Sequence, residues 1–307
     1  MDVSVVICTY AIDRYEDFSE AVESVLEQSY NSVEVIVVVD GNETVTQRVR
    51  TDFADDDIVV HNNDENRGVS YSRTKGAEIA TGDVVAFIDD DAVADPDWIS
   101  ELVRGYEDTD ALAVGGRMTG SWLAGRPWFL PAEFDWLVGV THRGFTTETE
   151  EVRNTFESNI SFRRETFLQL GGFDPELGPK ADEYRNSEGS EIGSRLQSEY
   201  ARGVLYVPTA VVTHKVFHYR TRFVWLARRA FKQGISKQTM EQRAVADSSE
   251  EFGFLYQLCT EHVPRRVGEL IRNPSVERIG QLLMLFVFTG LVGIGYLYST
   301  IRYFVSR

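Results

Sequence analysis

The chain has 307 residues, with 31 Lys and Arg against 48 Asp and Glu, so its formal net charge is −17. A hydrophobic share of 43% is ample for a core, which excludes wholesale disorder. Cys8 and Cys259 match no metal-ligand spacing and are interpreted as thiols in a reducing compartment, so a disulfide scaffold is excluded. Because this charge repels nucleic-acid phosphates, we expect no nucleic acid among the partners.

Lysine is scarce in this acidic chain. It occurs at five positions, whereas arginine is abundant and carboxylates crowd stretches such as residues 52–57. Such a surface suits a protein kept hydrated in concentrated salt, where charges are screened within about 3 Å at 1 M. We therefore expect a salt-loving source, and an ordinary acidic protein is the alternative.

Apolar runs alternate with segments of helical spacing through the first half of the chain. Mostly apolar, non-alternating runs at residues 3–8, 33–39, 58–61 and 84–88 predict strands covered on both faces, and residues 18–27 and 68–80 predict helices. We expect an α/β fold with a mainly parallel sheet. Because such sheets bind ligands at the carboxyl ends of their strands, the polar residues that follow these runs are candidates for a ligand site.

The second half of the main domain has less regular patterning. Residues 122–144 are rich in aromatic residues and proline without clear periodicity, which favours a loop or lid. The remaining segments indicate strands at 111–118, 155–162 and 204–207, and helices at 164–170, 190–201 and 223–233.

Residues 279–298 form a run of 20 residues without a charge, which as a helix at about 1.5 Å per residue is about 30 Å long, the hydrocarbon thickness of a bilayer. We expect one transmembrane anchor at residues 279–301, after a main domain at 1–240 and a helical linker at 241–278. A buried core helix is the alternative. Arg265, Arg266, Arg272 and Arg278 precede the run, so single-pass topology at the cell membrane places the main domain on the cytoplasmic side.

An acidic triplet, Asp89, Asp90 and Asp91, follows directly after the apolar run at residues 84–88. Carboxylates this close repel one another, and a bound cation would compensate for that repulsion. Mg²⁺ and Mn²⁺ take hard oxygen ligands and commonly join one or two carboxylates to substrate phosphates. The triplet therefore indicates a divalent metal beside a diphosphate, and a solvated acidic turn is the alternative.

Six short motifs follow one another along the chain. They are residues 3–10, the run that ends at Asp40, residues 66–68 with Arg73, the triplet, residues 171–174, and residues 206–208 leading to His214. Their order and spacing resemble those of the inverting family-2 glycosyltransferases. The resemblance extends from residue 3 to residue 237 and implies the nucleotide-diphospho-sugar transferase fold called GT-A, with a glycosyltransferase catalytic domain at residues 1–240.

The resemblance also implies roles for individual residues. Asp40 accepts a hydrogen bond from the nucleoside base, and Asp91 with His214 binds the divalent metal, although a core histidine bonded to a backbone carbonyl is the alternative for His214. The residues implied to bind the nucleotide sugar share the strand ends and the loops after them: Thr9, Tyr10, Asp40, Arg67, Arg73, Asp89 and Asp90.

Inverting transfer needs a base that takes the proton of the acceptor hydroxyl. The family places a Glu-Asp pair at the start of a helix, and its aspartate is the base. In this chain Gly189 stands where that aspartate is expected. We therefore expect Glu188 to be the base, with Glu191 on the first helical turn as the second candidate.

Cations gather between residues 220 and 237. By resemblance to lipid-directed relatives, Arg228, Arg229 and Lys237 contact the acceptor or a phosphate, and arginine suits the phosphate of a polyprenyl carrier or of the donor. A solvated basic helix face is the alternative for these residues.

The resemblance, the acidic lysine-poor surface and the predicted anchor together indicate a membrane-bound transferase. Within the family, the chain resembles haloarchaeal enzymes that extend a dolichol-phosphate-linked glycan for N-glycosylation of surface proteins, such as those of an S-layer. The implied donor is a UDP-sugar, with a hexuronic acid donor such as UDP-glucuronate as the specific expectation. A transferase for exopolysaccharide or glycolipid, and a nucleotide-sugar-binding subunit that lost catalysis at Gly189, are the alternatives.

Overall fold

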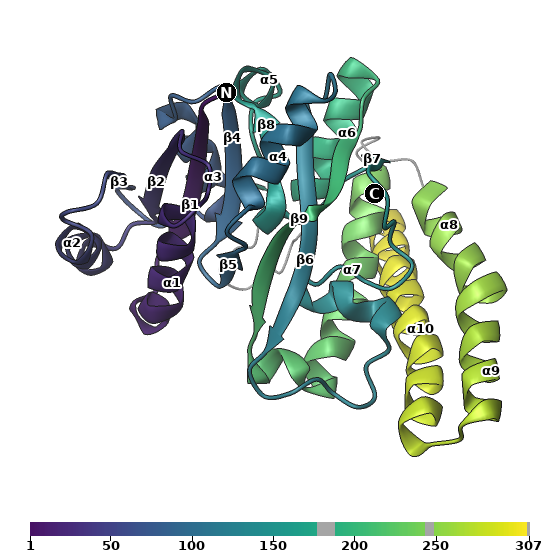
Figure 1. Ribbon diagram of the computed structural model, residues 1–307. Helices are drawn as coiled ribbons and strands as arrows, with labels where there is room; N and C mark the ends of the chain where they lie inside the picture. The colour runs from purple at the N-terminus through teal and green to yellow at the C-terminus, as the bar shows by residue number, and fades with distance from the viewer. Residues whose placement is uncertain (177–187, 243–248, 306–307) are drawn as a thin grey trace. The chain divides into compact units, whose positions relative to one another are not determined.

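The computed structural model describes residues 1–176, 188–242 and 249–305 (Figure 1). The chain divides into two compact units. The first unit comprises Met1–Thr119 and Thr146–His214, and the second unit comprises Gly120–Phe145 and Lys215–Arg307. Ser187, before the expected base, and residues 243–248 of the expected linker lie outside the described residues.

A nine-stranded sheet has the order β3-β2-β1-β4-β8-β6-β9-β5, with β7 paired to β9. Neighbouring strands among β3, β2, β1 and β4 are parallel, which is the expected arrangement. The pairs β4–β8, β6–β8, β5–β9 and β7–β9 are antiparallel. The strands are β1 (Val3–Thr9), β2 (Val33–Val39), β3 (Ile58–Asn62), β4 (Val84–Asp89), β5 (Ala92–Ala94), β6 (Ala113–Trp122), β7 (Glu150–Val152), β8 (Ile160–Arg163) and β9 (Val204–Val216).

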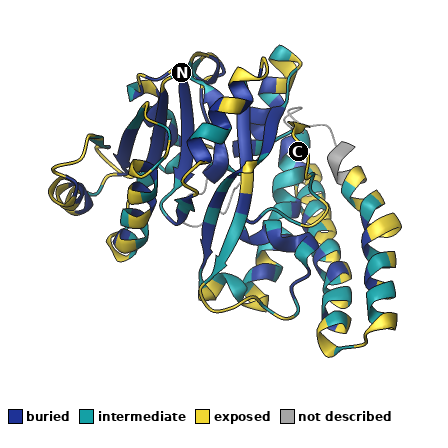
Figure 2. Cartoon of the chain, viewed as in Figure 1, coloured by how far each residue is buried: buried dark blue, intermediate teal, exposed yellow. Residues whose placement is uncertain are grey.

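Both faces of β1, β2 and β4 are covered, which is why their sequences are mostly apolar. Val5 and Val37 belong to one core cluster, whereas their neighbours Val6 and Val38 belong to another. Figure 2 shows these strands as mostly buried. The first cluster includes residues of α1 (Tyr15–Leu26), α2 (Glu43–Asp52) and α4 (Trp98–Glu107), and the second includes residues of α3 (Val69–Ile79), α5 (Arg164–Gln169) and α6 (Glu188–Tyr200).

The prediction of a strand at residues 155–162 is wrong for the first half of that range. A single turn of 3-10 helix, η3 (Glu157–Asn159), precedes β8, which begins at Ile160. The buried side chain of Asn159 explains the turn, because it accepts a hydrogen bond from Nε1 of Trp98 at 2.8 Å and donates one to the carbonyl of Ala210 at 2.9 Å. These bonds satisfy a polar group that has no place in a fully apolar strand.

The second unit is helical around its own core. The segment expected as a loop or lid contains the 3-10 helix η2 (Ala132–Val138), whose Phe134 packs against Phe288 with ring centroids 5.4 Å apart. The other elements of this unit are η4 (His218–Thr221), α7 (Phe223–Gln242), α8 (Ser249–Gln257), the π-helical turn η5 (Leu258–His262), α9 (Val263–Arg272) and α10 (Val276–Val305).

Helix α10 is the one helix of the described residues that is long and apolar enough to cross a membrane. It begins after Ser275, whose hydroxyl accepts the N–H of Arg278 at 3.2 Å. One face packs along α7, where Gly234 and Gly295 leave no room for a side chain and allow the two backbones to approach closely (Figure 1). The opposite face carries exposed apolar residues: Ile279, Leu283, Phe286, Ile294, Leu297, Ile301 and Phe304.

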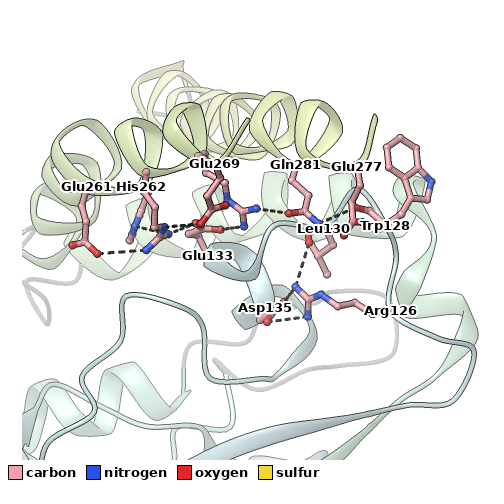
Figure 3. Close-up of polar contacts among 12 residues, drawn as sticks. Arg126, Trp128, Leu130, Glu133, Asp135, Glu261, His262, Glu269, Glu277 and Gln281 are labelled. Carbon is pink, nitrogen blue, oxygen red and sulfur yellow. Dashed lines mark hydrogen bonds and ion pairs between the residues drawn. The ribbon is translucent and has the colours of Figure 1, made fainter. Parts of the chain in front are cut away.

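A buried ion-pair network joins η2 to α9 and α10 (Figure 3). Glu133 is fully buried and accepts hydrogen bonds from Arg265 at 2.5 Å and from both Nε and Nη2 of Arg266 at 3.1 and 2.6 Å. Arg266 also contacts Gln281 on α10, and Gln281 donates to the carbonyl of Trp128 at 3.0 Å. Two arginines that precede the apolar run therefore neutralise a buried carboxylate inside the second unit.

Candidate active site

The ends of three parallel strands bring the expected nucleotide residues to one edge of the sheet. Cys8 of β1 is in register with Asp89 of β4, and Thr9 is in register with Val39 of β2. The N–H of Asp40 donates to the carbonyl of Thr9 at 2.8 Å. Thr9, Asp40 and Asp89 therefore lie side by side, because the strands that carry them are parallel and in register.

Asp40 organises the loop that leads into α3. Its Oδ1 accepts the N–H of Arg67 at 2.9 Å and the side-chain amide of Asn63 at 2.8 Å, and its Oδ2 accepts the N–H of Gly68 at 2.8 Å. Gly68 has a φ of 90°, which a glycine adopts without strain. The carboxylate thus holds the backbone that carries Arg67, a role that the sequence did not predict.

Two of the expected nucleotide residues are open to solvent. Tyr10 is exposed just beyond β1, and Arg67 is exposed with its guanidinium group over the ring of Tyr71 at 4.1 Å. A planar cation and an aromatic ring beside the strand ends are suited to a base and to phosphate oxygens.

The acidic triplet spans the turn between β4 and β5. Asp89 and Asp90 are half-buried, whereas Asp91 is buried. Burial, and after it the charges of Asp91 and Asp89, raises the pKa of Asp90 to about 7. A site that holds three carboxylates at this spacing favours a cation.

Asp91 and His214 lie together because β5 pairs with β9. Ala92 is in register with His214, and Nε2 of His214 is 3.3 Å from Oδ1 of Asp91. Arg14 approaches the other oxygen of Asp91 at 4.0 Å. Within residues 1–176, 188–242 and 249–305, no group of three or more His, Cys, Asp or Glu is placed to hold a metal, so the protein would supply two ligands here. A carboxylate and an imidazole suit a divalent ion whose remaining ligands are phosphate oxygens and water.

Arg73 connects the triplet to α6. It is buried, and its Nη2 is 2.5 Å from Oδ1 of Asp89 while its Nη1 is 3.1 Å from Oε1 of Glu188. Glu188 is 3% exposed. Burial first, and then the negative charge of Glu157, raises the pKa of Glu188 to about 8, although Arg73 opposes the shift. The arginine expected to line the nucleotide is therefore bound to two carboxylates.

The two residues expected as the base have different partners. Glu191 forms a bidentate ion pair with Arg195, at 2.7 and 2.5 Å, and Arg195 also donates to the carbonyl of Gly172 at 2.7 Å. These contacts fix α6 against the turn after α5. Glu188, in contrast, lies in the cluster with Arg73.

The carboxylate of Glu157 also belongs to this cluster. Its Oε1 accepts the N–H of Gly189 at 2.9 Å, and Asp89 donates its N–H to the hydroxyl of the adjacent Ser158 at 3.0 Å. Glu157 was not among the predicted site residues, because the residue pattern placed it in a strand. A charged residue inside a predicted strand is the signal that could have identified it.

The expected acceptor contacts lie in the second unit. Arg228 is exposed on α7, and Arg229 and Lys237 are half-buried on the same helix. These three assignments stay predictions.

The chain belongs to glycosyl transferase family 2, because the model of that family matches residues 4–171, more than half of its length. It is therefore a glycosyltransferase. A glucosyl-dolichyl phosphate glucuronosyltransferase of Haloferax volcanii is 50% identical over 301 residues, which cover 97% of this chain and 96% of the relative. The expected family and the expected glycosyltransferase activity are confirmed.

Solved structures show the same fold at low sequence identity. A mannosyltransferase of Pyrobaculum calidifontis in complex with GDP-Man and Mn²⁺ has a TM-score of 0.59 at 15% identity and covers 98% of this chain and 86% of its own. Residues 1–349 of TarS from S. aureus, in complex with UDP-GlcNAc, have a TM-score of 0.57 at 15% identity. The match covers 95% of this chain and 82% of the TarS chain. The expected GT-A fold is therefore confirmed.

Proposed function

We propose that this enzyme transfers glucuronic acid from UDP-glucuronate, with inversion, to a glucose-bearing dolichol phosphate in archaeal protein N-glycosylation. The observation that carries the proposal is the 50% identity to the Haloferax volcanii glucuronosyltransferase over nearly the whole of both chains. That identity extends far beyond the family match at residues 4–171, so it includes the second unit and α10. An alignment that continues beyond the nucleotide-binding half supports a shared acceptor as well as a shared fold.

The described contacts suit a nucleotide sugar at the carboxyl ends of β1, β2 and β4. Tyr10 and Arg67 are exposed beside the buried Asp40, where a nucleoside and its phosphates would meet an aromatic ring and a guanidinium group. Arg73 balances the charge of Asp89, which limits repulsion between the triplet and an anionic donor. We assign the nucleotide sugar to these residues together with Thr9 and Asp90.

We further propose that Asp91 and His214 hold Mn²⁺ or Mg²⁺. The two side chains are buried and their nearest atoms are 3.3 Å apart, so their oxygen and nitrogen donors converge on one place. An ion held by these two residues would supply positive charge to stabilise a departing nucleoside diphosphate.

We propose that α10 anchors the enzyme in the cell membrane as a single span with the catalytic residues on the cytoplasmic side. Support comes from its apolar face, which is exposed along the length of the helix. An exposed apolar surface of this extent is unfavourable in water and is typical of a helix that contacts lipid. Arg272 and Arg278 flank its beginning, as expected for a cytoplasmic end. A dolichol-linked acceptor lies in the same membrane, so the anchor would keep the enzyme beside it.

The test is transfer by the purified full chain in high-salt buffer with Mn²⁺. Radiolabelled UDP-glucuronate and glucosyl-phosphodolichol are expected to give a lipid product that is heavier by one hexuronic acid in mass spectrometry. UDP-glucose and UDP-N-acetylglucosamine serve as matched donors. Preferential transfer from either of these, or no lipid product with a donor that binds, would contradict the proposal.

A further inference from the structure

The carboxyl group of Glu157 occupies the space that a side chain at position 189 would fill. The φ angle of Gly189 is not in the left-handed region, so its backbone admits an ordinary side chain. A Cβ at position 189 would lie 2.7 Å from Cδ and 2.9 Å from Cγ of Glu157, and closer still to Oε1. These are the three nearest heavy atoms, and all belong to Glu157.

Glu157 is held in this position from both sides. The N–H of Gly189 donates to its Oε1 at 2.9 Å, which ties it to the first turn of α6. On its own turn η3, Ser158 is bonded to the backbone of Asp89 and Asn159 is bonded to Trp98. The carboxyl group therefore belongs to a fixed arrangement beside the acidic triplet.

Glu157 is also the most available carboxylate of this cluster. Glu188 is 3% exposed and bound to Arg73, and both oxygens of Glu191 are bonded to Arg195. Glu157 is half-buried, and among the described residues only the N–H of Gly189 donates to it. Within the part of the chain that the structure describes, no N–H or O–H group donates to its Oε2.

We propose that Glu157 is the general base, in place of the side chain absent at Gly189. The inference rests on the proposed glycosyl transfer. The acceptor hydroxyl gives its proton to a carboxylate oxygen of Glu157 while its oxygen bonds to the anomeric carbon of the donor. The bond from that carbon to the diphosphate breaks, and its electron pair leaves with the diphosphate.

The first test is Glu157→Gln in the full chain, compared with Glu188→Gln and Glu191→Gln. Glutamine keeps the oxygen that accepts the N–H of Gly189 but takes no proton, so a purely structural role would survive. Turnover is expected to fall by about 100-fold or more while donor affinity is retained. Unchanged turnover, or lost donor affinity, in Glu157→Gln overturns the proposal. Loss in Glu188→Gln alone would return the base to that residue.

The second test moves the carboxylate back to position 189. Glu157→Ala removes the atoms that crowd Gly189, so an aspartate fits there in Glu157→Ala/Gly189→Asp. The double variant is expected to recover part of the turnover that Glu157→Ala loses, whereas Gly189→Asp alone gains nothing because Glu157 crowds it. A double variant that binds donor but recovers no turnover contradicts the idea that one carboxylate site is filled from either residue.

Failure of the proposed function gives a different result. If the wild-type chain transfers another sugar, the same variants are compared with that donor. If it transfers to no acceptor, they are compared in hydrolysis of the donor, where water gives its proton to the same base. Equal hydrolysis by wild type and Glu157→Gln would then overturn the assignment of Glu157.

Discussion

Nη1 of Arg73 is 3.1 Å from Oε1 of Glu188, a residue 115 positions away in the sequence. The same guanidinium group is 2.5 Å from Asp89, so one buried cation joins the end of β4 to the start of α6. Both elements carry residues of the candidate site. The relative position of the triplet and the carboxylates on α6 therefore depends on this arginine.

Arg73→Gln is expected to lower the free energy of unfolding by about 1–3 kcal/mol, because it leaves the buried carboxyl group of Glu188 and the half-buried carboxylate of Asp89 without their guanidinium partner. Urea unfolding in high-salt buffer measures the change. Lys75→Gln is the matched control, since Lys75 is paired with Glu78 at 3.0 Å on the exposed face of the same helix and is expected to cost less than about 0.5 kcal/mol. Similar losses in the two variants would show that Arg73 is not a structural cation.

The raised pKa of Glu188 predicts a loss of stability as pH rises. Burial, and then the charge of Glu157, shifts the pKa from 4.5 to about 8, so the folded chain holds this proton where the unfolded chain has released it. The contribution is fully present below pH 4.5 and is lost by about pH 8. Glu188→Gln keeps a neutral group, so its free energy of unfolding is expected to fall less over this interval. Equal slopes in urea unfolding across the pH series would contradict the shift.

The strands were predictable because their physical cause is local. Residues 3–8 and 33–39 are mostly apolar, with Ser4 and Glu34 as exceptions, since helices cover both faces of these strands. The same pattern predicted that the triplet lies beside the other polar strand ends, because parallel strands place their carboxyl ends at one edge of the sheet. Patterning of this kind depends only on neighbouring residues in the chain.

The contacts that the sequence did not reveal are long-range pairings. Nothing near Glu157 shows that its carboxylate meets Gly189, which is 32 residues away. Likewise, the pairing of Glu133 with Arg265 and Arg266 joins residues more than 130 positions apart. A sequence pattern gives the burial of a segment, but the partner of a buried charge depends on which elements the fold brings together.

His214→Ala is expected to weaken activation by Mn²⁺ about tenfold or more, because one of the two proposed protein ligands is lost. The measurement is transfer by chelator-treated full chain during Mn²⁺ titration. His218→Ala is the matched control, since His218 is exposed on η4 and lies beyond the end of β9. An unchanged Mn²⁺ requirement in His214→Ala would contradict the metal assignment.

The exposed apolar face of α10 predicts that this helix binds the enzyme to the membrane. Phe286 and Ile294 are 54% and 57% exposed on this face and lie away from α7, so arginine at either position changes no packing in the second unit. If the face meets lipid, Phe286→Arg/Ile294→Arg costs about 5–7 kcal/mol near the bilayer centre, which is sufficient to displace the full chain from lipid vesicles. Leu26→Arg/Val59→Arg is the control, because both residues are exposed and apolar in the first unit. Cosedimentation with vesicles is expected to fall only in the α10 variant, and equal cosedimentation of both variants would show that the face does not contact lipid.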